Sequence, residues 1–391
     1  MKIKLRQAFD LQMGKTPTRN RPDYWNGDHK WISIADIGNA GKFLTKTKES
    51  ITEAGIDGSG IKVVPQGTVI MSFKLSIGKT AITSEDMYTN EAIMAFIDNG
   101  KFAIDTDYLY HLCCGTNWTA GTNKAVMGLT LNKATLLEKE IPLPDINEQH
   151  EIATKLDKID AIIAERQQQL ELIDQAVKSR FIELFCDPVT NPYGWQQLTV
   201  NDVCVSIVRG PFGSALKKEF FVPPSDTTYK VYEQKHAIQK SSTIGTYYVT
   251  AEKYNELRRF ECHSGDILMS CSGTMGELYQ LPAGCERGII NQALCKFTLN
   301  ERILPIAFLA YMRETIGNLE TKGSGIQNIA AVSYVKAMPI NLPPMRVQEQ
   351  FAAFVEQTDK SKYYSSLSFR YCQAAANTYR QEWMTCRTSD F

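Results

Sequence analysis

The 391-residue sequence lacks the features that mark membrane, secreted and metal-binding proteins. It has no run of about 18 apolar residues, which a membrane-spanning helix needs. Its N-terminal segment, MKIKLRQAFD, contains no apolar stretch like that of a signal sequence. None of its ten cysteines forms a CxxC pair, so neither a zinc site nor a disulfide framework is expected. We therefore expect a cytoplasmic protein with free thiols, no bound metal and no membrane association.

Recognisable catalytic motifs are missing as well. There is no GxxxxGK[ST] loop, so ATP hydrolysis is not expected, and the five histidines show no familiar pairing with a nucleophile. Asn191-Pro192-Tyr193 resembles part of the Asn/Asp-Pro-Pro-Tyr/Phe tetrapeptide of adenine methyltransferases. The second proline, a preceding apolar strand and a methyl-donor loop are absent, which favours a linker turn over a self-contained methyltransferase. The chain is expected to bind rather than to catalyse, and to need no cofactor.

The whole chain has no excess of positive or negative charge, because it carries 43 basic and 43 acidic side chains. Residues 1–144 hold 17 basic and 15 acidic side chains, and residues 188–344 hold 15 and 13. Residues 145–187, which lie between these two segments, hold 5 basic and 10 acidic side chains. The acidic excess therefore lies in the middle segment, and any DNA site must be a local basic patch.

What the sequence does contain is an internal repeat with a shift of about 199 residues. The segment IPLPDINEQHEIATKLDKID (141–160) aligns without a gap on INLPPMRVQEQFAAFVEQTD (340–359), and this alignment pairs Gln149 with Gln348. Two copies are too few for a solenoid. The repeat therefore predicts two similar globular modules, each followed by a helix.

A second match lies upstream, where GTVIMSFKLSIG (67–78) aligns on GDILMSCSGTMG (265–276). Short apolar segments rich in β-branched and aromatic residues, bounded by glycine-rich turns, predict strands in both copies. We therefore expect an α+β protein with two similar mixed modules of about 140 to 150 residues.

Each copy runs into a long stretch without proline or glycine, 145–187 and 345–391, directly after a proline turn where a helix can begin. In the first stretch, alternating spacings of four and three place apolar residues on one seam, interrupted by Arg166 and Arg180. The apolar seam residues are Ile152, Leu156, Ile159, Ile163, Leu170, Ile173, Val177 and Leu184.

The equivalent seam of the second stretch begins with Phe351 and Val355 and continues through polar residues, so that its ends fit the pattern and its middle does not. The simplest partner for each amphipathic helix is the other one. The pattern predicts an antiparallel coiled coil, with two helices that each pack on their own module as the alternative.

Two turn-rich loops in each copy carry polar side chains: 14–21 and 72–79 in the first, 208–218 and 270–276 in the second. The first three combine basic and hydroxyl side chains, and the last contributes hydroxyl groups alone. Such side chains can contact phosphates or base edges. An ordinary solvated loop is the competing interpretation for any one residue, but recurrence at equivalent places favours binding. The candidate DNA-binding residues are Lys15, Thr16, Thr18, Arg19, Arg21, Lys74, Ser76, Lys79, Arg209, Ser214, Lys217, Lys218, Ser272 and Thr274.

These segments together resemble the specificity (S) subunits of Type I restriction-modification enzymes. The resemblance covers essentially the whole chain and depends on GKTPTR with WISIADI, the GTVIMSFKLSIGK segment, IPLPDINEQHEIATKLDKID, RGPFGSALKKEFF and GDILMSCSGTMG. It implies target-recognition domains at 1–144 and 188–344, and conserved helical spacers at 145–187 and 345–391. It also implies a non-catalytic subunit that binds double-stranded DNA and two methyltransferase (M) subunits, with nuclease-translocase (R) subunits as further candidates.

A helix of about 40 residues is roughly 60 Å long, and one turn of DNA is roughly 34 Å. Two modules held by such helices could therefore read separate stretches of DNA, which predicts a bipartite target with an unread gap. The two half-sites are expected to differ, because the loops GKTPTR and RGPFGS differ. The alternative from another class is a two-module protein scaffold that does not involve DNA.

Overall fold

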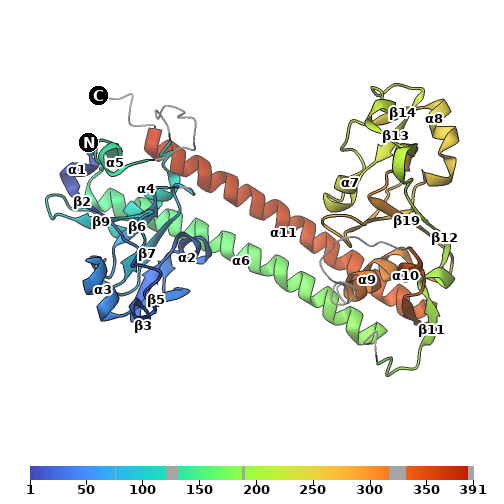
Figure 1. Cartoon of the computed structure of the whole chain (residues 1–391), viewed down its shortest axis with the longest axis horizontal. Helices are drawn as coiled ribbons and strands as arrows, with labels where there is room; N and C mark the ends of the chain where they lie inside the picture. The colour runs from blue at the N-terminus through green and yellow to red at the C-terminus, as the bar shows by residue number, and fades with distance from the viewer. Residues whose placement is uncertain (75, 120–130, 187–189, 317–331, 386–391) are drawn as a thin grey trace. The chain divides into compact units, whose positions relative to one another are not determined.

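The computed structural model describes residues 1–391 apart from 75, 120–130, 187–189, 317–331 and 386–391, and apart from the side chains of 381–385. The chain packs as two units (Figure 1), Met1–Gln168 with Ser365–Phe391, and Gln169–Tyr364. Two long helices, α6 (Ile146–Phe185) and α11 (Met345–Thr385), each contribute one part to both units. No helix in the described ranges is long and apolar enough to cross a membrane.

The first unit is built on two main sheets. The larger has the strand order β2 (Phe9–Met13), β9 (Ile93–Asp98), β6 (Val69–Ser72), β7 (Thr80–Thr83) and β4 (Phe43–Leu44). The smaller has the order β5 (Glu49–Ile51), β3 (Trp25–Ile32) and β8 (Tyr88–Thr89), in which β3 and β8 are parallel. A third pair joins β1 (Lys2–Lys4) to β10 (Glu140–Pro142) and so brings the start of the module to its end.

Short helices cover these sheets, and a buried apolar cluster joins the larger sheet to α4 and to the start of α6. The short helices are α1 (Leu5–Ala8), α2 (Ile34–Asn39), α3 (Glu53–Ser59), α4 (Thr106–Gly115) and α5 (Lys133–Leu137), with a 3-10 turn at Pro22–Tyr24. Ile152 and Leu156 of α6 lie inside this cluster, 3% and 2% exposed. The helix is therefore anchored in the core of the module from which it starts.

The second unit repeats this plan. Its first sheet has the order β12 (Cys204–Arg209), β19 (Leu294–Leu299), β16 (Ile267–Ser270) and β17 (Leu278–Gln280). Its second has the order β14 (Tyr248–Thr250), β13 (Thr228–Tyr232), β18 (Gly288–Ile290) and β15 (Glu261–Cys262). The pair β11 (Gln196–Thr199) and β20 (Pro339–Leu342) closes the module as β1 and β10 do in the first unit.

The helices of the second unit are α7 (Gln234–Ile238), α8 (Ala251–Glu256), α9 (Pro305–Ile316) and α10 (Val332–Lys336), with 3-10 turns at Val200–Val203, Gly213–Ala215, Lys218–Phe220 and Arg258–Phe260. The strand β13 is parallel to β18, as β3 is to β8. The predicted α+β class with two similar modules is confirmed.

The aligned glutamines Gln149 and Gln348 show the repeat at the level of single hydrogen bonds. Gln149 Oε1 accepts from the backbone N–H of Asp105 at 2.9 Å, and its Nε2 donates to the carbonyls of Ala103 and Pro144 at 3.0 Å each. Gln348 repeats this pattern with Leu304, Arg302 and Pro343 at 2.9, 3.0 and 3.0 Å. Both side chains are buried and so join the start of α4 to α6 and of α9 to α11.

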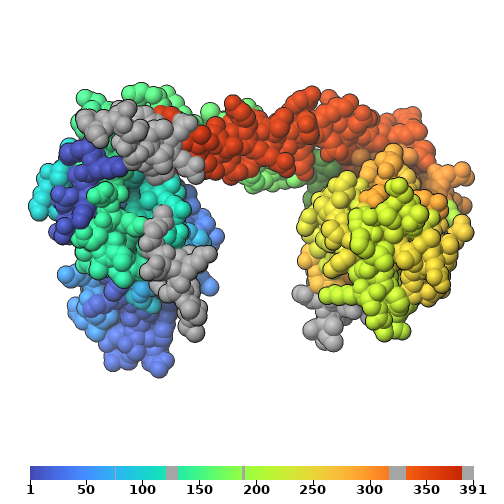
Figure 2. All heavy atoms as spheres, turned by 90° about the horizontal axis from the view of Figure 1, so that it is seen from above, coloured from blue at the N-terminus to red at the C-terminus, as the bar shows by residue number. Residues whose placement is uncertain are grey.

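In the second unit, α6 and α11 lie side by side (Figures 1 and 2) and run antiparallel (Figure 1). Asp174 pairs with Lys362, whereas Phe181, further along α6, packs on Phe351 at the start of α11 with 5.7 Å between ring centroids. Val355 is also buried there, and Val177 is half-buried against the same cluster. The predicted antiparallel coiled coil is confirmed.

In the first unit, the far end of α11 packs beside the start of α6. Arg380 Nη2 lies 2.6 Å from both carboxylate oxygens of Asp160, and Ala376 is completely buried. The helix α11 is continuous despite its polar seam positions. One of these positions, Lys362, pairs with Asp174 of α6, and Arg380, beside the seam, pairs with Asp160. Ile159, Ile163, Leu170 and Ile173 of the predicted α6 seam are half-buried.

The tripeptide at 191–193 forms a turn. Asn191 has a positive φ of 42°, and its side chain accepts from the backbone N–H of Trp195 and donates to its carbonyl, both at 2.9 Å. The asparagine amide is thus used to close the turn, as the linker interpretation predicted.

Candidate nucleic-acid interface

The first candidate loop leaves each module at the same place. A Cβ on Gly14, after β2, would lie 2.0 Å from the carbonyl oxygen of Thr89, and one on Gly210, after β12, would lie 1.9 Å from that of Asn291. The backbone N–H of Gly14 donates to Ile93 at 3.3 Å, and that of Gly210 donates to Leu294 at 3.0 Å. Only glycine permits so close an approach, so the loops 14–21 and 208–218 begin from equivalent positions.

The second candidate loop is closed by a serine in each copy. The hydroxyl of Ser270 donates to the carbonyl of Thr274 at 2.6 Å and accepts from the N–H of Glu277 at 2.9 Å. Ser72 likewise donates to the carbonyl of Ser76 and accepts from the N–H of Lys79 at 3.1 Å. These bonds leave the side chains of Ser76 and Thr274 exposed.

In the first unit the two loops meet around Glu91, just before β9. The Thr16 hydroxyl donates to its carboxylate. This hydrogen bond, together with the positive charges of Lys74 and Arg19, holds the pKa of Glu91 below its usual value. Thr16 of the first loop therefore contacts this carboxylate directly, and Arg19 and Lys74, one from each loop, act on its charge.

The structure shows intramolecular partners for the loop cations that the sequence did not reveal. Arg19 pairs with Glu49, and its guanidinium carbon lies 4.0 Å from the ring centroid of Trp25. Arg21 pairs with its neighbour Asp23 at 2.7 Å. Both arginine side chains remain more than half exposed, so these pairs orient them without removing them from solvent.

The other candidates of the first unit, Lys15, Thr18 and Lys79, each contact a neighbouring segment. Lys15 Nζ donates to the carbonyl of Ser59 at 3.2 Å, and the carbonyl of Thr18 accepts from the indole of Trp25 at 3.3 Å. Lys79 is exposed, and its ammonium group lies against Gly38 of α2.

Arg209, a candidate DNA-binding residue of the second unit, is largely buried. It is only 9% exposed, and its guanidinium carbon lies 5.0 Å from the ring centroid of the exposed Phe212. Its positive charge also helps to lower the pKa of Cys271, after a hydrogen bond with Cys295, which has the largest effect. Arg209 is the last residue of β12 and is buried at the point where the loop begins.

The other candidates of this unit are more accessible. Ser214, Lys217 and Lys218 are exposed, and Lys217 lies 3.5 Å from Glu219. The carbonyls of Ser272 and Thr274 both accept from the side-chain amide of Gln234, which ties the second loop to α7. The second unit therefore presents exposed lysines, one of them near a carboxylate, whereas the first presents arginines that pair with carboxylates.

Sequence reasoning missed a turn that lies beside both loops of each unit. It contains Asn90-Glu91-Ala92 in the first unit and Asn291-Gln292-Ala293 in the second. The signal was present, because the pattern Asn-x-Ala recurs with a shift close to that of the main repeat.

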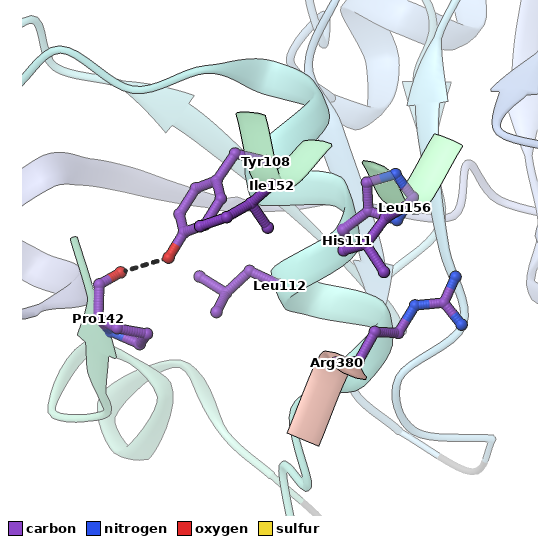
Figure 3. Close-up of a pocket in the computed structure, with 7 residues that line it drawn as sticks. All are labelled: Tyr108, His111, Leu112, Pro142, Ile152, Leu156 and Arg380. Atoms are coloured by element: carbon purple, nitrogen blue, oxygen red, sulfur yellow. Dashed lines mark hydrogen bonds between the residues drawn. The ribbon is translucent and has the colours of Figure 1, made fainter. Parts of the chain in front are cut away.

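A small cavity lies where α4, α6 and α11 meet in the first unit, and Figure 3 shows its lining. Its volume is about 20 Å³, enough for about one water molecule. Tyr108 donates to the carbonyl of Pro142 at 2.9 Å, and His111 Nε2 lies 2.8 Å from Asp157. Burial lowers the pKa of His111 and outweighs the opposing effect of Asp157. The cavity belongs to the helix junction and is too small for an organic ligand.

Among the residues that the structure describes, no cluster of three or more histidine, cysteine, aspartate or glutamate side chains is arranged to hold a metal ion.

Comparison with known proteins identifies the family to which this chain belongs. The sequence model of the Type I restriction modification DNA specificity domain matches residues 1–173 and 192–363. The chain belongs to this family. Each matched range contains one complete pair of candidate loops.

Curated members of the family are similar to parts of the chain. The specificity subunit of the type I restriction enzyme MjaIX from Methanocaldococcus jannaschii is 28% identical over 203 residues, which are 51% of this chain and 46% of that protein. The EcoprrI specificity subunit from Escherichia coli is 27% identical over 177 residues, 42% of this chain and 43% of that protein. In these alignments the chain spans less than half the length of each relative.

Solved structures share the fold over nearly the whole chain. A chain from a structural study of complex assembly and conformational transition of the type I R-M system has a TM-score of 0.65 and 16% identity, and the match covers 98% of this chain and 97% of that one. The S subunit of a Type-I restriction-modification system from M. genitalium has a TM-score of 0.52 and 13% identity, with coverage of 98% and 96%. Members of the DNA specificity family are therefore similar to this chain in sequence, and proteins of type I restriction-modification systems share its fold.

Proposed function

We propose that this chain is the DNA-reading specificity subunit of a Type I restriction-modification enzyme. The observation that supports this most directly is the recurrence of a loop pair at equivalent positions in the two units of a chain from the DNA specificity family. Residues 1–144 and 188–344 would each read one half-site of double-stranded DNA. The segments 145–187 and 345–391 would act as the spacers between them.

The two half-sites are expected to differ because the loops present different side chains. The first unit presents Arg19 and Arg21, each oriented by a carboxylate, whereas the second presents Lys217, Lys218 and the exposed ring of Phe212. Arginine forks pair with guanine edges, while lysine acts mainly as a point charge toward phosphates. An asymmetric, bipartite target follows from this difference and from the spacers.

The chain would perform no chemistry itself. Two methyltransferase (M) subunits would supply the methyl donor and the adenine chemistry, and nuclease-translocase (R) subunits are further proposed partners. The whole chain has no net charge, and sequence-independent affinity for DNA comes mainly from neutralised phosphates. We therefore expect the M subunits to supply most of the sequence-independent affinity for DNA.

A gel-shift series with the full chain, alone and with its M subunits, tests this proposal. We expect weak binding by the chain alone, and tight binding that depends on sequence once the M subunits are added. Sequence-specific binding that needs no M subunit would contradict the division of labour. A complex that assembles but shows no sequence preference would contradict the proposed function.

A further inference from the structure

The turn beside the two loops has the same geometry in both units. In the first, Asn90 Oδ1 accepts from the N–H of Ala92 at 3.0 Å, and its carbonyl accepts from Ile93 at 3.2 Å. In the second, Asn291 accepts from Ala293 and Leu294, at 3.1 Å in both cases. The asparagine fixes the turn, so the residue after it is held at an equivalent position in each unit.

That residue is Glu91 in the first unit and Gln292 in the second, and both side chains are exposed. Glu91 lies among Thr16, Arg19 and Lys74 of the two candidate loops. The backbone nitrogen of Gln292 lies 3.0 Å from the position that a Cβ of Gly210 would occupy, directly where the loop 208–218 departs. The backbone next to each residue also contacts the second loop, because the carbonyls of Ala92 and Ala293 accept from the N–H groups of Phe73 and Cys271 at 3.0 and 2.8 Å.

A carboxylate is an unfavourable group on a surface that approaches phosphates, because like charges repel. Glu91 nevertheless lies there, and the hydrogen bond from Thr16 favours its charged form and lowers its pKa. A charged carboxylate is useful on such a surface when it accepts a hydrogen bond from a base, and the exocyclic amino group of cytosine is such a donor in the major groove. Glutamine at the same place would instead make two hydrogen bonds to adenine.

We propose that Glu91 and Gln292 are specificity-determining residues, one in each half-site. Glu91 accepts from the amino group of a cytosine, and Gln292 pairs with the N6 and N7 atoms of an adenine. This inference depends on the proposed function, because it names which side chains perform the reading.

The competing explanation is that Glu91 only anchors the loop through Thr16. The variant Thr16→Val removes that hydrogen bond and keeps the carboxylate. If Glu91 reads a base, Thr16→Val retains the base preference of the wild type even where overall affinity falls. If Glu91 is only an anchor, Thr16→Val and Glu91→Gln have the same effect on every duplex.

The experiment measures binding of the full complex to duplexes in which each position of both half-sites is changed to the other three base pairs. For Glu91→Gln we expect the preference for a C·G pair at one position of the first half-site to fall roughly tenfold to hundredfold, since a good base contact contributes about 1 to 3 kcal/mol. The profile of the second half-site stays unchanged. Gln292→Glu gives the reciprocal result, with a lost preference for adenine in the second half-site.

Glu85→Gln is the matched control, because Glu85 is also an exposed glutamate of the first unit with a side-chain partner, but that partner is Lys30 of β3. It should leave both profiles unchanged. Wild-type profiles in both reading variants would overturn this inference while the proposed function stands. If the wild-type complex itself shows no base preference, the proposed function fails and this inference fails with it.

Discussion

Gln149 and Gln348 satisfy the same three backbone groups in the two units, one N–H and two carbonyls, with distances that agree within 0.1 Å. A carboxamide is suited to this because it both donates and accepts. Each glutamine therefore ties the start of a long helix to its module.

Replacing Gln149 with leucine leaves these backbone groups unpaired in a buried site. We expect a loss of about 1 to 3 kcal/mol of stability, the usual cost of an unsatisfied buried polar group. Hydrogen exchange should increase in α4 and not in α9, while Gln348→Leu should give the reverse. Gln168→Leu, at an exposed position of α6, is the control and should change exchange in neither α4 nor α9. If Gln149→Leu increased exchange equally in both helices, the effect of Gln149 would not be local to its own unit.

The ion pair of Arg380 with Asp160 should stabilise the packing of α11 in the first unit. The arginine side chain is 16% exposed and the carboxylate 36%, so we expect a coupling energy of roughly 1 kcal/mol in a double-mutant cycle of Arg380→Gln and Asp160→Asn.

A matched cycle on Lys360 and Glu356, an exposed pair on α11 with side chains 71% and 72% exposed, should give about 0.3 kcal/mol. Equal coupling in both cycles would show that partial burial adds nothing to the pair at Arg380. Denaturant unfolding monitored by circular dichroism measures both.

Stability should fall as the pH drops below about 6.5, the ordinary pKa of histidine. The pKa of the buried His111 is lowered in the folded state, so the unfolded chain binds a proton that the folded chain does not. The slope approaches about 1.4 kcal/mol per pH unit between the two pKa values, and the loss stops below the folded one. Thermal unfolding of His111→Gln should be less sensitive to pH in this range. An unchanged pH profile in His111→Gln would contradict the assignment.

Lys217 and Lys218 are expected to contact phosphates. Replacing both with alanine should weaken binding of the full complex to all sequences alike and reduce the slope of log K against log salt by about 1 to 2. The exposed Lys360→Ala on α11 should leave the slope unchanged. A change in base preference without a change in slope would instead assign these lysines to base reading.

The repeat made much of this architecture predictable. The alignment of Gln149 with Gln348 placed both helix starts, and the spacing of Ile152, Leu156 and their successors predicted the seam. Periodicity works here because a long helix depends on contacts that recur every three or four residues.

The pairing within the candidate interface was not predictable in the same way. Arg19 meets Glu49 because Trp31 of β3, whose ring faces the Arg19 guanidinium, is paired with Glu49 of β5. Arg209 is buried at the end of β12, where it is paired with Cys295 of β19. Both facts depend on residues far apart in the chain, which local patterns do not connect. Glu91 was overlooked because an acidic residue is not an obvious member of a DNA surface.

The central claim is that two unlike readers on one chain define a split target. Single-molecule sequencing of methylated adenines, in the host genome with the gene intact and deleted, tests it most directly. The account predicts a motif of two different half-sites separated by a fixed stretch of unread bases, and its loss on deletion. A continuous or palindromic motif, or methylation that is unchanged by deletion, would contradict it.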